Sequence, residues 1–182
     1  MSLFVVSGPS GSGKTTIIHR LVDMLDLDFS VSTTTRARRS GERHGVDYRF
    51  VTEDEFGATR ERGGFLEWAV YNGNYYGTPA AQLDKAIKGG RDVLLDIEVE
   101  GAKQVRERRP EATMIFIAPP SLQELESRLR GRGDTSDSDI LGRLEIARGQ
   151  LSQAEELFDH VVVNDDLDRA TAEVANLITA AE

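Results

Sequence analysis

A glycine-rich segment near the N-terminus contains the residue types that bind a polyphosphate. The pattern G-x-x-x-x-G-K-[S/T] is matched in full by the run Gly8-Pro9-Ser10-Gly11-Ser12-Gly13-Lys14-Thr15. Glycines let backbone N–H groups turn inward around phosphate oxygens, and the N-terminus of a following helix adds its positive dipole end. Lys14 can reach the β- and γ-phosphates, and the Thr15 hydroxyl can bind Mg²⁺. The segment therefore predicts a site for a nucleoside triphosphate.

Apolar residues flank this segment in the way that a strand and a helix would. An apolar run covers 3–6, and apolar residues follow at helical spacing, at Ile17, Ile18, Leu21, Val22 and Leu25. Strand, glycine loop and helix in that order form the context that the motif needs. A Gly/Ser-rich turn without a ligand is the alternative, and the agreement between motif and flanks favours the phosphate-binding loop.

The polar and aromatic stretch 32–80 contains a second group of candidate binding residues. Three of its arginines fall within four residues, at Arg36, Arg38 and Arg39. A guanidinium binds a phosphate through two hydrogen bonds, and a tyrosine hydroxyl can donate to the same oxygens. A carboxylate such as Glu67 can accept from both the N1–H and the 2-amino group of guanine, a pair that adenine lacks. An arginine cluster can also be a solvated surface, and tyrosines can belong to a core, so their occurrence together indicates the site.

These segments resemble the guanylate kinase family, whose members transfer a phosphoryl group from ATP to GMP. The resemblance runs from the glycine loop to residues 163–168, which is nearly the whole chain. Its most specific parts are 32–36, 45–50, 67–69 and 73–78, which read Ser-Thr-Thr-Thr-Arg, Gly-Val-Asp-Tyr-Arg-Phe, Glu-Trp-Ala and Gly-Asn-Tyr-Tyr-Gly-Thr. It implies an ATP:GMP phosphotransferase that acts in purine nucleotide metabolism with Mg²⁺ as cofactor.

The resemblance also implies which residues bind each substrate. The ATP-binding residues it implies are Gly8, Pro9, Ser10, Gly11, Ser12, Gly13, Lys14, Thr15, Thr16 and Asn164. The GMP-binding residues it implies are Ser32, Glu67 and Thr78 for guanine, Arg36, Arg39, Tyr48 and Tyr76 for the phosphate, and the strand-end carboxylates Asp96 and Glu98. It implies Thr15 and Asp96 as metal ligands, and Lys14, Arg132 and Arg143 as catalytic residues. Glu98 is one methylene longer than the aspartate that the family often has there.

Phosphoryl transfer between nucleotides needs no general base from the protein, because the acceptor phosphate is already an anion. Catalysis then comes from in-line positioning and from neutralising charge on the transferring group. We therefore assign no catalytic role to the scattered histidines. Arg128 and Arg148 lie close enough in sequence to the lid arginines to take part, or they are surface residues of a helix.

The elements that must position these residues alternate between strands and helices. Strand-like apolar runs occur near 3–7, 92–97, 112–117 and 160–163. Near-continuous apolar strands of this kind predict an α/β fold of the P-loop NTPase type, with a parallel sheet covered by helices on both faces. One helix is expected after the apolar run near 92–97 and should end at Arg108. A second should begin at a capping box at 121–124 and end at Arg130, and a third should cover 167–180. A further helix is expected to place Ile140, Leu141, Leu144, Ala147, Leu151 and Ala154 on one face.

Two stretches interrupt this alternation within what we expect to be one domain, 1–182. Residues 32–80 are expected to form a small mixed β insert that binds the nucleoside monophosphate. Residues 131–139 read as a mobile loop in a helical lid, 126–151. The core then comprises 1–31, 81–125 and 152–182. Two such inserts suit an enzyme that closes over two substrates.

Composition limits the possible partners. The 182 residues have a formal net charge of −9, which argues against non-specific nucleic-acid binding. Cysteine is absent, so disulfides and thiolate chemistry are excluded. Since there is no apolar run of about 18 residues and no signal peptide, we expect a cytoplasmic enzyme without membrane contact. ATP and GMP are the expected partners, and the sequence leaves open whether the chain is a monomer or a homo-oligomer.

The sequence is also compatible with two other functions. Some guanylate-kinase-like domains bind phosphorylated peptides instead of catalysing a reaction, although such domains tend to lose the glycine loop. A related kinase could act on another phosphorylated acceptor, such as a ribose bisphosphate, but it would have no reason to keep Ser32 and Glu67. Nothing in the sequence excludes dGMP as a second acceptor.

Overall fold

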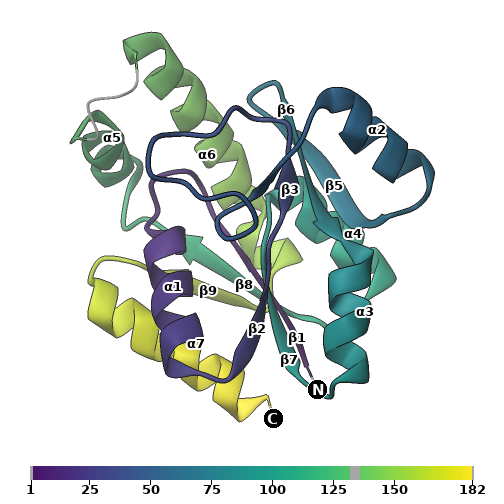
Figure 1. Cartoon of the computed structure of the whole chain (residues 1–182). Coiled ribbons are helices and arrows are strands. Elements are labelled where there is room, and N and C mark those ends of the chain that lie inside the picture. Colours follow the sequence, from purple (N-terminus) through teal and green to yellow (C-terminus); the bar gives the residue numbers. More distant parts are fainter. Residues whose placement is uncertain (1, 132–135, 182) are drawn as a thin grey trace. The chain divides into compact units, whose positions relative to one another are not determined.

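The computed structural model describes residues 2–131 and 136–181 of the chain (Figure 1). Its strands are β1 (Leu3–Ser7), β2 (Leu27–Ser30), β3 (Thr33–Thr34), β4 (Arg49–Phe50), β5 (Phe65–Tyr71), β6 (Asn74–Pro79), β7 (Asp92–Asp96), β8 (Thr113–Ala118) and β9 (His160–Val163). Its helices are α1 (Lys14–Met24), α2 (Glu53–Glu61), α3 (Ala80–Lys88), α4 (Val99–Arg108), α5 (Leu122–Gly131), α6 (Asp137–Leu157) and α7 (Leu167–Ala180).

A parallel five-stranded sheet with the order β2-β7-β1-β8-β9 is flanked by helices, which confirms the predicted fold class. All residues of β1 are buried, and so are five of the six residues of β8. The near-continuous apolar runs arise because both faces of such a strand are covered. The predicted strands are found as β1, β7, β8 and β9, while β2 was not predicted. It pairs in parallel with β7, from Leu27 opposite Asp92 to Ser30 opposite Leu95.

The chain divides into two compact units, the first formed by Met1–Val5 with Asp26–Ala112, and the second by Val6–Leu25 with Thr113–Glu182. In the second unit α1 and α7 pack side by side (Figure 1). Helices α5 and α6 share a separate apolar cluster, whose members are Leu125, Leu129, Ile140 and Ala147, with Leu122 and Leu144 packed against it. This unit therefore contains the glycine loop, the helix that follows it and the helix pair α5–α6.

Helix α6 differs from its prediction in its start and in its buried face. It begins at Asp137, where the Ser136 hydroxyl accepts a hydrogen bond from the Asp139 N–H, so residues 137–139 belong to a helix and not to a loop. Leu141 is 63% exposed, whereas Gln150 is buried. The predicted face was therefore wrong at Leu141, because the buried stripe passes through Ile140, Ala147 and Ala154 instead. The central part of the predicted lid loop lies outside the described residues.

The first unit contains a second, four-stranded mixed sheet with the order β4-β3-β6-β5. Strands β5 and β6 form a hairpin, and Figure 1 shows α2 beside it. Phe56 from α2 stacks on Phe65 at 4.4 Å and on Tyr75 at 5.3 Å between ring centroids. The predicted mixed β insert is thus present, but it also contains the unpredicted helix α2. That helix begins with a full capping box between Thr52 and Glu55.

Candidate functional site

The glycine loop connects β1 to α1 in the conformation that the phosphate-binding motif requires. Gly13 precedes the helix with a φ of 91°, in the left-handed region that favours glycine. A Cβ atom on Gly8 would lie 2.3 Å from the backbone oxygen of Ile117, so any side chain there would clash with β8. Buried in the same unit are the hydroxyls of Ser7 and Ser12, which have no hydrogen-bond partner among the described residues. The loop backbone therefore packs closely against β8, and the loop contains one buried hydroxyl, that of Ser12, without a hydrogen-bond partner among the described residues.

Asn164 fixes this loop from the other side. Its side-chain Nδ2 donates to the backbone oxygen of Ser12 at 2.7 Å, and its own backbone N–H donates to Ala118 at 2.8 Å. Arg128 in turn donates to the backbone oxygen of Asn164 at 3.0 Å and to Glu124 at 3.0 Å. Asn164 was expected from resemblance to contact ATP. In this structure the Asn164 amide group holds the loop, and Arg128 holds Asn164.

The other predicted residues of this unit that the structure describes lie on the two helices α1 and α6. Lys14 begins α1, and Thr15 and Thr16 are exposed in its first turn. Arg143 is half-buried on α6, whereas Arg148 on the same helix is exposed. Arg132, predicted as a catalytic residue, lies outside the described residues.

In the first unit, three of the predicted phosphate-binding residues come together. The Tyr48 and Tyr76 rings lie 6.0 Å apart in an edge-to-face arrangement, and the Arg36 guanidinium lies 5.4 Å from the centre of the Tyr48 ring. Burial opposes ionisation of Arg36, but hydrogen bonds with Glu42 and Tyr76 outweigh it and raise the pKa of the guanidinium above its ordinary value. Successive side chains of β6 point to opposite faces of the sheet, so its two adjacent tyrosines are separated. Tyr75 stacks on Phe56, whereas Tyr76 joins this cluster.

Glu42 is a residue of this cluster that the sequence analysis missed. It accepts hydrogen bonds from Arg36 Nη2 at 2.7 Å, from Arg36 Nη1 at 3.0 Å and from the Arg39 backbone N–H at 2.7 Å. The hydrogen bonds from Arg36 lower the pKa of the Glu42 carboxyl below its usual value. Since residues 35–48 form no regular helix, a spacing of six residues gave no signal that these side chains meet.

A buried carboxylate lies at the place predicted for guanine recognition. Glu67 is 3% exposed, and its Oε1 accepts a hydrogen bond of 2.5 Å from the Thr78 hydroxyl, directly across the β5–β6 hairpin. Burial, with a smaller contribution from the nearby Glu98 carboxylate, raises the pKa of Glu67 to about 7 against the opposing effects of Thr78 and Arg108. Ser32 is buried just before Thr33, which pairs with Gly77, so Ser32 enters β3 next to Thr78.

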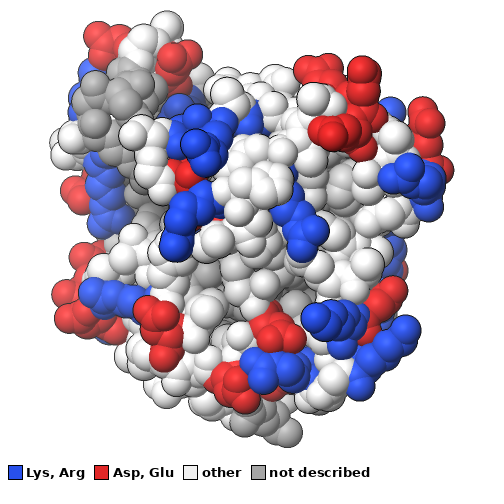
Figure 2. Space-filling model, in the orientation of Figure 1, with Lys and Arg blue, Asp and Glu red and all other residues white. Residues whose placement is uncertain are grey.

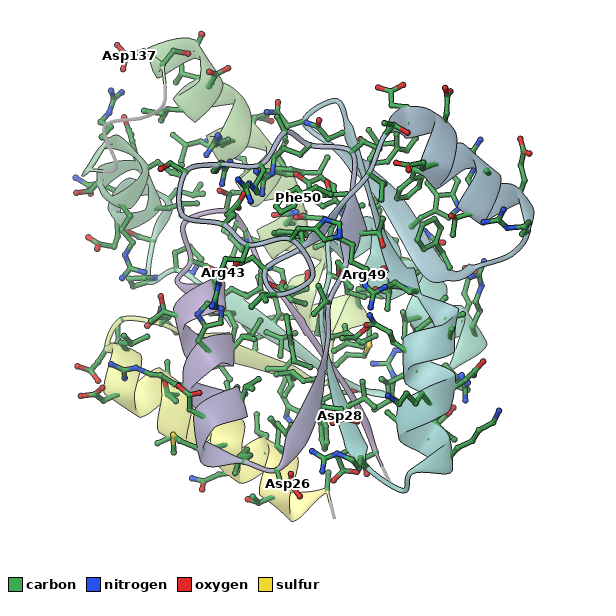
Figure 3. All side chains as sticks on the ribbon, in the orientation of Figure 1. Asp26, Asp28, Arg43, Arg49, Phe50 and Asp137 are labelled. Carbon is green, nitrogen blue, oxygen red and sulfur yellow. The ribbon has the colours of Figure 1, made fainter. Side chains whose placement is uncertain are left out.

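The remaining predicted residues of this unit lie at loop and strand ends. Arg39 is exposed on the loop that follows β3. Figure 2 shows several Lys and Arg side chains on the visible face. Figure 3 labels two exposed arginines, Arg43 on the same loop and Arg49 at the start of β4. Asp96 ends β7, and Glu98 is the residue that precedes α4.

The described residues contain no group of three or more histidine or acidic side chains arranged to hold a metal. Among those residues, no helix has the length and apolar character needed to cross a bilayer.

Comparison with known proteins gives the family of this chain. A family model described as guanylate kinase matches residues 1–181. The chain is 50% identical over 178 residues to a guanylate kinase of Parasynechococcus marenigrum, covering 97% of both chains. It is 46% identical over 177 residues to one of Rubrobacter xylanophilus, covering 97% of this chain and 92% of that one. The crystal structure of guanylate kinase from Anaplasma phagocytophilum is similar with a TM-score of 0.82 at 33% identity, covering 98% of this chain and 85% of that one.

The matches run along the whole chain, so they include both the glycine loop of one unit and the Glu67–Thr78 pair of the other. A binding module that has lost the loop, or a kinase for a different acceptor, would not match relatives of one name at this identity and coverage. The family model and these relatives, together with the phosphate-binding loop and the buried carboxylate, show that the chain belongs to the guanylate kinase family, the enzymes that phosphorylate GMP with ATP.

Proposed function

We propose that Glu67 is the residue with which this enzyme distinguishes GMP from other nucleotides. The observation that carries this proposal is the burial of its carboxylate with one oxygen already engaged by Thr78. A buried carboxylate is costly unless it is paired, and guanine supplies two donors on one edge. Ser32 and Thr78 complete the guanine contacts in this proposal, and Arg36, Arg39, Tyr48 and Tyr76 bind the phosphate.

The glycine loop, Thr16 and Asn164 are the proposed binding residues for ATP. An oxygen of the GMP phosphate attacks the γ-phosphorus, the bond from that phosphorus to the β–γ bridging oxygen breaks, and ADP and GDP result. Lys14, Arg143 and Arg132 stabilise the charge that develops on the transferring group. Asp96 and Glu98 stand beside the acceptor. The acceptor oxygen is already anionic, so no side chain has to remove a proton from it.

Magnesium is the proposed cofactor, with Thr15 and Asp96 as its protein ligands. Mg²⁺ usually keeps several waters and is held by one or two protein oxygens together with substrate phosphates. Thr15 is exposed in the first turn after the loop, so its hydroxyl is available as one such oxygen. When bound, the ion neutralises charge on the β- and γ-phosphates.

We further propose that dGMP is a second acceptor, since no predicted guanine or phosphate contact involves the ribose 2′-hydroxyl. We also propose that the enzyme acts in purine nucleotide metabolism in the cytoplasm. The insert 32–80 and the lid 126–151 are the proposed substrate-binding parts of one domain with a core of 1–31, 81–125 and 152–182.

The substitution Glu67→Gln tests the proposal, because it keeps the volume but loses one acceptor oxygen. We expect kcat/KM for GMP to fall by a factor that corresponds to a loss of roughly 2–4 kcal/mol in transition-state stabilisation, and kcat/KM for AMP to stay unchanged. A coupled assay with GMP, dGMP, AMP and a ribose phosphate measures this, with the exposed Glu61→Gln on α2 as control. Equal losses for GMP and AMP would mean that Glu67 has a structural role only.

A further inference from the structure

The outer edge of β5 is covered by side chains of α4. Strand β5 is the last strand of its sheet, so one edge of its backbone has no neighbouring strand. Gln104 Nε2 donates to the Trp68 backbone oxygen at 2.6 Å, and Gln104 Oε1 accepts from the Trp68 backbone N–H at 3.3 Å. The carboxamide therefore forms with Trp68 the pair of hydrogen bonds that another strand would form.

A second side chain of α4 binds the backbone on the other side of Glu67. Arg108 donates through Nη1 to the backbone oxygen of Leu66. The β5–β6 pairing shifts register between Phe65 and Glu67, so Leu66 lies in an irregular part of the strand that regular pairing does not fix. Gln104 and Arg108 together fix the two residues that flank Glu67.

Gly101 provides the space in which the Glu67 carboxylate lies. A Cβ atom on Gly101 would lie 2.0 Å from Glu67 Oε2 and 2.9 Å from Glu67 Cδ. Those distances place the carboxylate directly against the first turn of α4. Gly101, Gln104 and Arg108 are spaced by three and four residues, so they lie on one face of the helix. Glycine is less favourable than alanine within a helix by about 1 kcal/mol, so this position gives up helix stability for close approach.

We propose that this face of α4, formed by Gly101, Gln104 and Arg108, positions Glu67 and thereby sets the selectivity for guanine. The inference rests on the proposed role of Glu67 and extends it to three residues that do not themselves contact the base. Thr78 holds Oε1 from the hairpin side, and Gly101 leaves room for Oε2 on the helix side. The carboxylate thus has one defined place between a strand and a helix.

Helix α4 also starts directly after the strand-end carboxylates. Glu98 is the N-cap residue of α4, and Asp96 ends β7 two residues earlier. The helix that positions Glu67 is therefore continuous with the segment that carries the two proposed acceptor-site carboxylates. A change in the α4 face should affect guanine binding through Glu67 without removing any group of the phosphoryl-transfer chemistry.

The experiment compares Gly101→Ala and Gln104→Leu with Lys103→Ala, which changes an exposed side chain of the same helix that is paired with Glu100. Gly101→Ala places a methyl group where the Glu67 carboxylate now lies, and urea unfolding of each variant shows whether its kinetic effect is accompanied by a loss of stability. For both α4-face variants we expect KM for GMP to rise about tenfold, with kcat changed by less than about twofold, and the GMP-to-AMP ratio of kcat/KM to fall in parallel. Lys103→Ala should leave all three values unchanged.

Glu67→Gln measured in the same assay separates the two proposals. If Glu67→Gln loses guanine selectivity and both α4-face variants keep it, the positioning role is overturned and the role of Glu67 stands. If Glu67→Gln itself keeps selectivity, the proposed function fails. A parallel fall in kcat and in the urea midpoint of both α4-face variants, at unchanged selectivity, would show that α4 only stabilises the fold.

Discussion

Arg36 donates two hydrogen bonds to the carboxylate of Glu42, six residues further along the same loop. Side chains of both residues are mostly buried, with exposed fractions of 14% and 18%. Glu42 therefore holds the guanidinium beside the Tyr48 ring before any phosphate arrives, and it also accepts the backbone N–H of Arg39. One acidic residue thus organises both arginines that we propose bind the GMP phosphate.

Glu42→Gln should weaken GMP binding and reduce stability. Removing one partner of a partly buried ion pair leaves the other charge uncompensated, so we expect a loss of about 1–2 kcal/mol in the free energy of unfolding and a KM for GMP about tenfold higher. Asp26→Asn is the matched control, because Asp26 and Asp28, labelled in Figure 3, form exposed ion pairs with Arg91. Urea unfolding and steady-state kinetics should show no change for that variant.

The stability of the ligand-free protein should fall as the pH rises towards neutrality. Glu67 has a pKa of about 7 in the folded protein against an ordinary 4.5, so the folded state keeps a proton that the unfolded state loses between these values. The unfolded state binds fewer protons in this window, and the free energy of unfolding should drop by roughly 3 kcal/mol across it.

Glu67→Gln isolates this effect, because it removes the titrating group and keeps its volume. Urea unfolding of both proteins at intervals from pH 4.5 to 8 should give curves that differ in slope below pH 7 and run parallel above it. Parallel curves throughout the range would show that folding does not raise the pKa of Glu67.

Arg143 and Arg39 should affect different kinetic constants. Arginines that meet developing charge in phosphoryl transfer contribute about 10³-fold or more in rate, so Arg143→Ala should lower kcat by about that factor with little change in nucleotide affinity. Arg39→Ala should raise KM for GMP by more than it lowers kcat. Arg148→Ala, on an exposed part of α6, is the control. The opposite pattern in steady-state kinetics would mean that the two roles are exchanged.

Gly13→Ala should weaken ATP binding through Asn164. The added Cβ would lie 2.2 Å from Asn164 Nδ2, which now donates to the Ser12 backbone. We expect the dissociation constant of ATP to rise at least tenfold, which corresponds to a loss of roughly 1.4 kcal/mol or more in binding free energy. Asn164→Ala alone is the reference, because Asn164 is itself a proposed ATP-binding residue. If the clash carries part of the effect, Gly13→Ala should cost less ATP affinity in the Asn164→Ala background than in the parent protein, while the left-handed backbone still costs some. Calorimetric titration with ATP checks this, and equal costs in both backgrounds would show that the clash is unimportant.

Local patterns in the sequence predicted the elements of this fold where they were long or strongly apolar. The runs that became β1, β7 and β8 are largely buried, so they read as strands without further context. The run that became β9 is apolar as well, although Val161 and Val163 are exposed at the edge of the sheet. The capping box at 121–124 correctly indicated the start of α5, where the Ser121 hydroxyl accepts the Glu124 N–H at 3.0 Å. The same signal was present at Thr52 and Glu55 and was overlooked within a stretch interpreted as β structure.

Contacts between distant residues could not be read in the same way. Strand β2 has only four residues, Leu-Asp-Phe-Ser, and pairing with β7 is what makes it a strand. Asn164 lies 152 residues from Ser12, and Gly101 lies far from Glu67, so no local pattern joins either pair. Resemblance named Glu67 and Asn164 as site residues, but only the three-dimensional arrangement shows which neighbours hold them.

The carboxamide of Gln104 has a consequence beyond nucleotide recognition. An uncovered strand edge is a template on which another polypeptide can add, and proteins that leave one exposed tend to aggregate. At Trp68 both backbone groups of the β5 edge are already occupied, so a second molecule finds nothing there to pair with. The side chain that we propose positions Glu67 should therefore also limit aggregation, and Gln104→Leu should scatter more light than the parent protein at equal concentration during slow heating.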